Sequence, residues 1–224
     1  MYTTRTMSKY NKEHFHIAYT TGSDVWTHIP YAPTALSMIR AVPPDTLVLD
    51  VGSGRGLWAF RMVDRGLRVI GLEYIEPMVQ KNNHEVKSRG IGDQIRFIHG
   101  DVLDIPFTDN GFGAVTDIGL LQHLPADDWP AYTNEIGRVI SPGGYYLNVS
   151  LSRETKKFMD IEPMLLTDGA YTKFGLSYYF FTDDEIADIF SDHFDIVQQR
   201  HETYDSAQGM RETVTLVFTL MQKK

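Results

Sequence analysis

The stretch Leu47-Val48-Leu49-Asp50-Val51-Gly52-Ser53-Gly54-Arg55-Gly56 decides the fold of this chain. Residues 47–51 are a short apolar run bounded by prolines before and glycines after, which is typical of a buried parallel strand. The glycines stand at every second position, and residues 57–63 then have helical character. Glycine is needed where the backbone takes a positive φ or where a ligand comes close to it. The stretch therefore predicts a strand, a ligand-binding loop and a helix whose first N–H groups face the ligand.

The spacing of the glycines separates two classes of nucleotide site. A dinucleotide-binding loop has the pattern G-x-G-x-x-G, whereas this chain has D-x-G-x-G-x-G with Asp50 at the strand end. The pattern resembles motif I of the class I S-adenosylmethionine (SAM) methyltransferases, in which the loop wraps the amino-acid end of SAM. The resemblance implies SAM as cofactor, S-adenosyl-L-homocysteine as product, and cofactor contacts from Asp50, Gly52, Ser53, Gly54 and Gly56. A glycine-rich turn without a ligand is the alternative.

Composition narrows the class of protein. The chain has 224 residues, 42% of them hydrophobic, which suits a single domain, residues 1–224, with a sizeable core. Its net charge of −8 disfavours nucleic acid as a partner, because an acidic surface repels phosphate backbones. The absence of cysteine excludes disulfides, Cys-ligated zinc and a Cys nucleophile. No apolar run approaches the ~20 residues of a membrane helix and no signal peptide is evident, so we expect a cytoplasmic protein.

A second strand is predicted over residues 67–73 and ends in an acid. Glu73 follows Gly54 by 19 residues, the spacing at which a carboxylate reaches ribose hydroxyls in nucleotide-binding βαβ units. A carboxylate can accept hydrogen bonds from both hydroxyls of a vicinal diol. We therefore assign Glu73 to the ribose and place Tyr74 and Ile75 beside the adenine. The alternative for Glu73 is an exposed acid at a strand end.

The third predicted strand, residues 94–99, leads into a loop with a second acid. By the family resemblance, Asp101 would accept a hydrogen bond from the adenine amino group and Val102 would offer its backbone N–H. Ligands of open α/β sheets bind outside the carboxyl ends of the strands, which is where this loop lies. An Asx-type turn at Asp101 is the alternative.

The fourth strand begins at Phe112, and the segment around it resembles small-molecule methyltransferases. The resemblance places Asp117, Ile118 and Gly119 beside the methionine part of SAM, with Asp117 using either its carbonyl or its side chain. Gln122 and His123 follow one turn later, near a substrate. His123 is a candidate base, and packing or helix capping are equally open for it. A helix over residues 129–139, a turn at 140–144 and a fifth strand over 145–150 complete this part.

Two segments fall outside the βα rhythm and are rich in aromatic residues. We expect residues 1–45 to form an N-terminal cap over the ligand end of the sheet, and residues 152–181 to form a lid-like insertion. Tyr19, Trp26, Gln122 and Tyr178 are the candidate substrate contacts. Plain packing, or a dimer contact for the insertion, are the alternatives. We predict no metal site, because the histidines at positions 14 and 16 would point to different faces of a helix.

The end of the chain completes an α/β fold. Thr182 and Glu185 form a capping box that starts a helix, and strands follow at residues 194–197 and 213–219. We predict a Rossmann-like, seven-stranded, mostly parallel sheet with helices on both faces and the last strand antiparallel. The predicted function is methyl transfer from SAM to a small-molecule acceptor. The alternatives are a protein or RNA methyltransferase, which would need a basic stripe at the site, and a non-catalytic SAM-binding module. The sequence leaves the oligomeric state open between monomer and homodimer.

Overall fold

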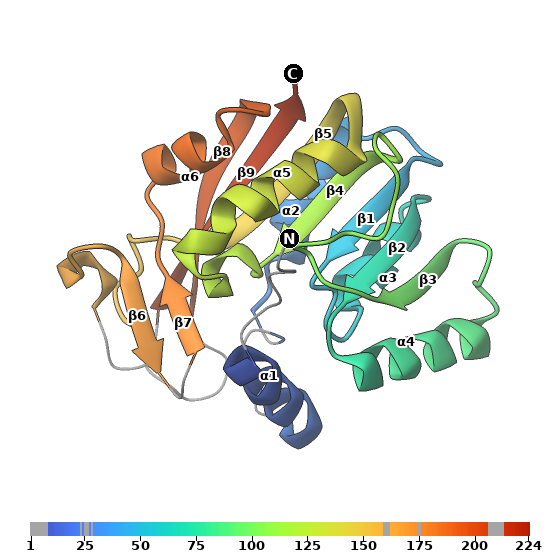
Figure 1. Ribbon diagram of the computed structural model, residues 1–224, viewed down its shortest axis with the longest axis horizontal. Coiled ribbons are helices and arrows are strands. Elements are labelled where there is room, and N and C mark those ends of the chain that lie inside the picture. Colours follow the sequence, from blue (N-terminus) through green and yellow to red (C-terminus); the bar gives the residue numbers. More distant parts are fainter. Residues whose placement is uncertain are drawn as a thin grey trace, which may run out of the picture.

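The computed structural model describes residues 9–22, 24, 27, 29–158, 162–173, 176–205 and 213–224. Its centre is one sheet of seven strands (Figure 1). The strands are β1 Leu47–Val51, β2 Arg68–Glu73, β3 Ile95–His99, β4 Phe112–Ile118, β5 Ile140–Leu151, β8 Phe194–Asp205 and β9 Thr213–Lys223. They lie side by side in the order β3-β2-β1-β4-β5-β9-β8.

The direction of the strands confirms the predicted fold class. Strands β1 to β5 pair in parallel, through β1 with β2 and β4, β2 with β3, and β4 with β5. Strand β9 is antiparallel to both of its neighbours, β5 and β8. The apolar runs read from the sequence become central strands because both faces of this sheet are covered.

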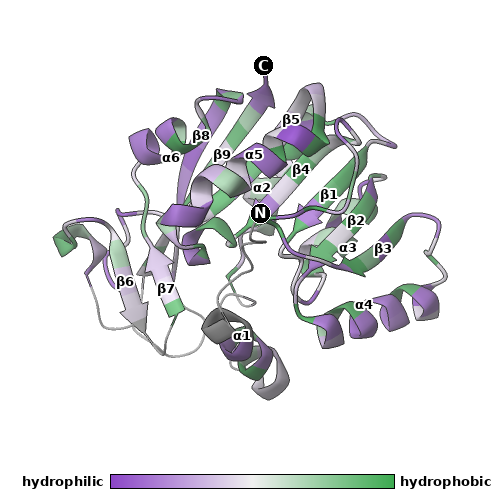
Figure 2. Cartoon of the chain, in the orientation of Figure 1, coloured by the Kyte–Doolittle hydropathy of each residue, from purple (hydrophilic) through white to green (hydrophobic). Residues whose placement is uncertain are grey.

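Helices cover both faces, and each face has its own apolar core (Figures 1 and 2). The helices of one face are α2 Ala32–Met38, α3 Leu57–Val63 and α4 Glu76–Arg89, and those of the other are α5 Trp129–Val139 and α6 Asp183–Phe190. Trp58 and Phe60 of α3 belong to the first core, and Tyr132 and Ile136 of α5 to the second. Figure 2 shows hydrophobic strands between helices whose outer sides are hydrophilic.

Two elements beyond the carboxyl ends of the parallel strands are not evident from the sequence pattern. They are helix α1 Lys9–Thr21, and a hairpin made of β6 Ala170–Lys173 and β7 Leu176–Tyr179 (Figure 1). Short 3-10 turns complete the chain: η2 Ile39–Ala41, η3 Leu121–His123, η4 Ala126–Asp128 and η5 Pro163–Leu165. Helix α1 contacts β7, so these two segments meet over the same end of the sheet.

Two local predictions can be compared with the observed backbone. The turn expected at residues 140–144 lies inside β5 as an irregularity, because pairing with β4 jumps from Phe112–Ile140 to Ala114–Tyr145. The capping box of α6 is confirmed. The Thr182 hydroxyl accepts from the Glu185 N–H at 3.2 Å, and the Glu185 carboxylate accepts from the Thr182 N–H at 2.8 Å.

Candidate active site

A cavity opens at the carboxyl ends of β1, β2 and β4 and continues beneath α1 to β7. Open α/β sheets bind ligands at this end, so its position agrees with the fold. The predicted site residues that line it are Tyr19, Asp50, Gly52, Ser53, Gly54, Glu73, Tyr74, Val102, Ile118, Gln122, His123 and Tyr178. Gly56, Asp101 and Asp117 do not belong to the lining, and Trp26 lies outside the described residues.

The glycine loop takes backbone conformations that other residues rarely adopt. Gly52, Gly54 and Gly56 have φ angles of +66°, +50° and +73°. A Cβ atom added to Gly54 would stand 2.6 Å from the Tyr19 hydroxyl oxygen, so a side chain there would fill the cavity. A Cβ on Gly56 would instead meet the Phe97 ring at 2.8 Å. Gly54 therefore keeps the loop open toward the cavity, Gly52 leaves room for the Leu120 side chain, and Gly56 allows α3 to pack on the sheet.

Glu73 is buried at the end of β2 and tied to the glycine loop. Its Oε2 accepts from the Gly54 N–H at 2.7 Å, and its Oε1 accepts from the Ile75 N–H at 2.8 Å. Burial raises the pKa of Glu73, while these two hydrogen bonds act in the opposite direction. Each oxygen has one protein partner and retains a lone pair, so the carboxylate can still accept from two ligand hydroxyls.

Three buried polar atoms in the cavity wall have no hydrogen-bond partner: Asp50 Oδ2, Ser53 Oγ and Trp58 Nε1. The other oxygen of Asp50 accepts from the Thr116 hydroxyl at 2.9 Å. Buried polar groups in native proteins are normally paired, so unpaired ones facing a cavity indicate a ligand. The ammonium and carboxylate of an amino acid would complement the open acceptor of Asp50 and the open donor of Trp58. The site therefore fits the amino-acid end of SAM.

Burial also controls the protonation of Asp50. It raises the pKa of this carboxyl to about 8, and the nearby acids Asp117 and Glu73 add to the rise, while the bond from Thr116 opposes it. A carboxyl of this kind is mostly protonated at neutral pH until a positive charge approaches it. Asp50 therefore holds a proton that a bound cationic ligand would displace.

The far end of the cavity is apolar and aromatic around one histidine. The His123 ring contacts the rings of Phe15 and Tyr178 edge to face, with centroids 5.2 Å and 4.9 Å apart. Phe158 packs against Tyr178 at 5.6 Å and also lines the cavity. His123 is 3% exposed, and burial lowers its pKa to about 4. The ring is therefore neutral near pH 7.

Comparison with known proteins agrees with this geometry. Residues 48–144 match the family described as "Methyltransferase domain". The sterol 24-C-methyltransferase of Yarrowia lipolytica is 36% identical over 113 residues, which are 50% of this chain and 29% of that protein. The demethylmenaquinone methyltransferase of Geobacillus kaustophilus is 36% identical over 112 residues, 48% of this chain and 46% of that protein. This chain thus spans less than half of the length of either relative.

Among solved structures, the 1,6-didemethyltoxoflavin-N1-methyltransferase of Burkholderia thailandensis matches with a TM-score of 0.78 at 22% identity. The match covers 96% of this chain and 87% of that chain, and that crystal contains S-adenosylhomocysteine. At this identity the likeness concerns the fold alone. Residues 48–144 thus resemble methyltransferase domains over a little less than half of the chain, and the fold of the chain resembles that of a solved methyltransferase.

Two of the predicted cofactor contacts have side chains that form other hydrogen bonds in the structure. Asp117 is fully buried on the α5 side of the sheet, where its side chain accepts from the Leu120 and Leu121 N–H groups at 2.7 and 3.1 Å and from the Tyr132 hydroxyl at 2.7 Å. Its side chain is committed to holding the β4–η3 turn, so the backbone carbonyl is the remaining group by which Asp117 would contact the cofactor. Asp101 Oδ1 accepts from the Leu103 N–H at 3.0 Å, which is the Asx-type turn named as the alternative.

Sequence reasoning missed an ion pair between Arg55, which lines the cavity, and Asp24. The Arg55 guanidinium donates to both oxygens of Asp24, at 2.7 and 2.5 Å, and to the Tyr19 carbonyl at 3.0 Å. Asp24 is 2% exposed and also accepts from the Thr27 hydroxyl. Burial alone would raise the pKa of Asp24, but the bonds from Arg55 and Thr27 outweigh it and lower the pKa. Arg55 of the glycine loop thus fastens Asp24 and the end of α1 to that loop.

Sequence reasoning also missed Trp58, which we assigned only to the helix after the loop. No pattern in one sequence marks a tryptophan as a ligand donor. The useful signal was its position in the first turn of α3, because that turn faces the ligand at a strand–loop–helix site.

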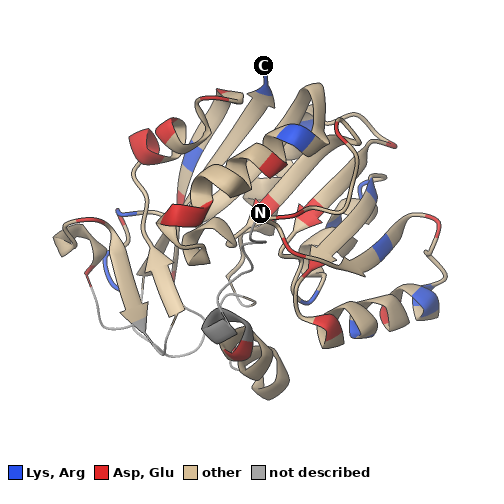
Figure 3. Ribbon diagram, viewed as in Figure 1, with Lys and Arg blue, Asp and Glu red and all other residues tan. Residues whose placement is uncertain are grey.

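The remaining predictions concern charge, metals and membranes. Arg55, paired with Asp24, is the one Lys or Arg among the described lining residues. Figure 3 shows both signs of charge spread over α4, α5 and β8 instead of a basic stripe. Within the described part of the chain, no group of three or more His, Asp or Glu could hold a metal ion. None of the described helices is long and apolar enough to cross a membrane.

Proposed function

We propose that this domain transfers the methyl group of SAM to a small, largely apolar acceptor. The observation that supports the proposal is one continuous cavity that reaches from the glycine loop to the aromatic side chains Phe15, Phe158 and Tyr178. The curated relatives are named for sterol, demethylmenaquinone and fatty acid methylation, which are reactions of small molecules. An apolar chamber that joins the cofactor loop suits such an acceptor.

The residues of the chain would share the work of positioning and water exclusion. SAM supplies a methyl group already activated by a positively charged sulfur. Glu73 and Asp50 would hold the ribose and the ammonium, and the aromatic end would orient the acceptor and exclude water. His123, neutral and buried, would accept a hydrogen bond from the acceptor. With a pKa of about 4 it is a poor store for a proton, so its proposed role is orientation.

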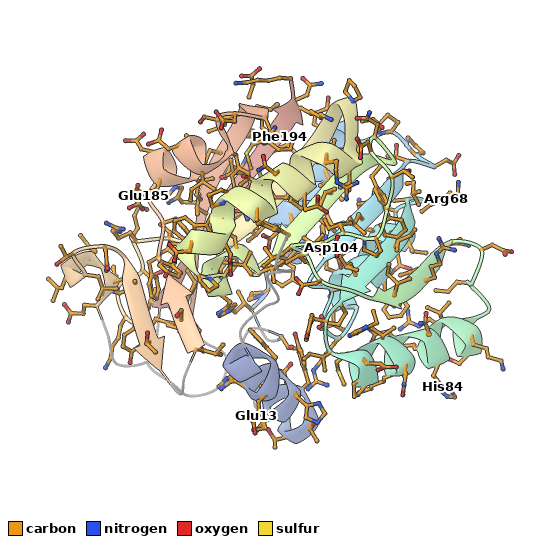
Figure 4. All side chains as sticks on the ribbon, viewed as in Figure 1. Glu13, Arg68, His84, Asp104, Glu185 and Phe194 are labelled. Carbon is orange, nitrogen blue, oxygen red and sulfur yellow. The ribbon has the colours of Figure 1, made fainter. Side chains whose placement is uncertain are left out.

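We further propose that α1 and the β6–β7 hairpin form the roof of the acceptor chamber. Phe15 of α1 and Tyr178 of β7 both pack against the His123 ring, and these contacts bring the two segments together. Figure 4 shows Glu13 of α1 pointing away from the sheet, as expected for a roof helix whose other side faces the cavity. The proposal keeps part of the cap expected at residues 1–45 and of the lid expected at residues 152–181, whereas α2 Ala32–Met38 belongs to a core on one face of the sheet.

The two alternatives fit the cavity less well. A protein or RNA methyltransferase needs an open acceptor side with cationic residues, whereas Phe158 and Tyr178 at the acceptor end are 6% and 2% exposed. A non-catalytic SAM-binding module needs a closed acceptor side, whereas the cavity continues past the glycine loop.

Thermal-shift measurements with SAM, S-adenosylhomocysteine and NAD test the cofactor part of the proposal. SAM and its product should stabilise the protein, NAD should not, and Gly54→Val should remove the SAM response because the new side chain would occupy the cavity. Production of S-adenosylhomocysteine with a panel of small acceptors then tests transfer. Stabilisation by NAD alone would contradict the proposal.

A further inference from the structure

The acceptor end of the cavity has two polar atoms whose hydrogen-bonding roles the surrounding backbone determines. The first belongs to Gln122. Its Oε1 accepts from the Leu151 N–H at 2.8 Å, and this bond orients the side-chain amide. The amide Nε2, a donor, therefore points toward His123, and Gln122 lines the cavity. Gln122 thus presents a hydrogen-bond donor to a ligand.

The second atom belongs to His123. Its Nδ1 lies 3.1 Å from the Ser177 carbonyl oxygen, which can only accept, so Nδ1 must carry the proton. Because the buried ring is neutral, the other nitrogen, Nε2, is an acceptor. The Nε2 atoms of Gln122 and His123 are 3.4 Å apart, longer than most hydrogen bonds of this kind. The polar edge of a ligand can therefore replace this long contact with two hydrogen bonds, one to each atom, at little cost in free energy.

The side chains beside this donor–acceptor pair include apolar ones. Phe15, Leu151 and Tyr178 line the cavity next to it. A buried polar atom that loses its partner costs more free energy than a formed hydrogen bond gains, so a ligand entering here must satisfy both atoms. Glutamine and asparagine read adenine through the same donor–acceptor complementarity.

We infer that Gln122 and His123 select an acceptor molecule whose polar edge has a carbonyl oxygen directly beside an N–H or O–H, on an otherwise apolar ring system. Cyclic amides and enolised diketones are this chemical class. The carbonyl would accept from Gln122 Nε2, and the N–H or O–H would donate to His123 Nε2. The inference rests on the proposed function, because it identifies the acceptor of the same site.

Methyl-acceptor molecules with other polar groups would fit the Gln122–His123 pair less well. A group that only accepts or only donates leaves one of the two atoms without a partner. A carboxylate has acceptors only and would face the acceptor Nε2 of His123. An ammonium group has donors only and would face the amide N–H of Gln122. The pair thus discriminates by the order of donor and acceptor along the ligand edge.

The test compares two probes that differ by one methyl group on nitrogen. Quinolin-2(1H)-one has a carbonyl beside an N–H on an apolar bicycle, and 1-methylquinolin-2-one lacks only the donor. Their affinities are measured by calorimetry or ligand-observed NMR in protein saturated with S-adenosylhomocysteine, so that no turnover occurs. We expect the wild-type protein to prefer the N–H probe by about tenfold or more.

Substitutions of Gln122 and His123 test whether these two residues cause the preference for the N–H probe. His123→Phe keeps a ring against Phe15 and Tyr178 but removes the acceptor, so the two probes should bind with nearly equal affinity. Gln122→Glu keeps an oxygen for the Leu151 N–H and replaces the donor by an acceptor, so the N–H probe should lose about tenfold or more. Phe158→Leu, the matched control in the apolar wall, should weaken both probes alike and leave their ratio unchanged.

Binding of S-adenosylhomocysteine, measured first in every variant, distinguishes a failure of the proposed function from a failure of the inference about the methyl acceptor. If the wild-type protein does not bind it, the proposed function fails. If it binds, equal affinities for the two probes, or no saturable binding of either up to its solubility limit, would overturn the inference alone. A preference that survives in His123→Phe would overturn it as well.

Discussion

Binding of SAM should release a proton from Asp50. This carboxyl is 2% exposed, its Oδ2 has no partner, and burial raises its pKa to about 8. The proposed neighbour of Oδ2 is the ammonium group of SAM, in a ligand that also carries a positively charged sulfur. A positive charge at hydrogen-bond distance favours the ionised carboxylate and lowers its pKa. The proton that the empty site holds must then leave.

The size of the effect follows from the pKa of the empty site. At pH 7 a group with a pKa of about 8 is about nine-tenths protonated, so binding should release about 0.9 proton if the carboxylate is fully ionised in the complex. Ionising it at pH 7 costs about 1.4 kcal/mol of binding free energy, and one pH unit lower about 2.7 kcal/mol. SAM affinity should therefore rise about tenfold between pH 6 and 7 and level off above pH 8.

Stability should respond to pH in the opposite direction. The pKa of Asp50 in the folded protein lies above the ordinary value of 3.8, so the empty folded state binds more protons than the unfolded state between about pH 4 and pH 8. The contribution of this group to the free energy of unfolding therefore falls as pH rises through that window. Asp50→Asn should remove this loss and weaken SAM binding at the same time.

Calorimetry in buffers of different ionisation enthalpy, such as phosphate and Tris, measures the released protons directly. The release should be close to the expected value in the wild-type protein and in Asp101→Asn, whose side chain does not line the cavity. It should drop sharply in Asp50→Asn, and any remainder belongs to Glu73, whose pKa burial also raises. Equal release in the wild-type protein and Asp50→Asn would refute the assignment of Asp50 to the ammonium.

Three further predictions address the walls of the site and the scaffold. Asp24→Asn and Arg55→Gln should each weaken SAM binding and speed proteolysis before residue 31. A double-mutant cycle should give a coupling free energy of about 1–3 kcal/mol between the two substitutions. Additive effects would contradict the proposal that this ion pair fastens Asp24 to the glycine loop. Glu73→Ala should weaken the binding free energy of SAM, measured by calorimetry, by about 1–3 kcal/mol, and Glu73→Gln should weaken it less. An unchanged affinity would contradict the proposal that Glu73 binds the ribose. Thr182→Ala should cost about 1 kcal/mol in urea unfolding and leave SAM affinity unchanged; a loss of SAM affinity would tie α6 to the site.

The central βα units could be predicted because local and global signals agree there. The apolar run at residues 47–51 and the alternating glycines after it specify a strand and a loop without knowledge of any distant contact. The roof could not be predicted in the same way. Helix α1 is a mostly polar helix, and the hairpin contains Tyr178, whose burial depends on Phe158 and on the ring of His123. The structure of α1 and the hairpin depends on tertiary packing, which cannot be seen in a single sequence.

Trp58 and Arg55 show a second limit of sequence reasoning. Both lie within or directly after the glycine motif, yet their roles depend on what approaches them from elsewhere. Arg55 is fastened to Asp24, 31 residues earlier in the chain. Trp58 differs from an ordinary core residue because its indole N–H has no protein partner in the cavity wall. Motif spacing indicates where a ligand lies, and only the packed structure shows which of the neighbouring polar groups remain available to it.

The two acids Asp50 and Asp117 show how one position of register decides a role. Both end neighbouring parallel strands, and sequence reasoning therefore placed both at the cofactor. In the sheet, Asp50 pairs with Thr116 while Asp117 pairs with Val51. Successive side chains of a strand point to opposite faces, so the two carboxylates cannot share one face. Asp50 reaches the cavity, and Asp117 instead binds Tyr132 of α5. A sequence shows where each strand ends, but the pairing between β1 and β4 determines which acid can meet the ligand.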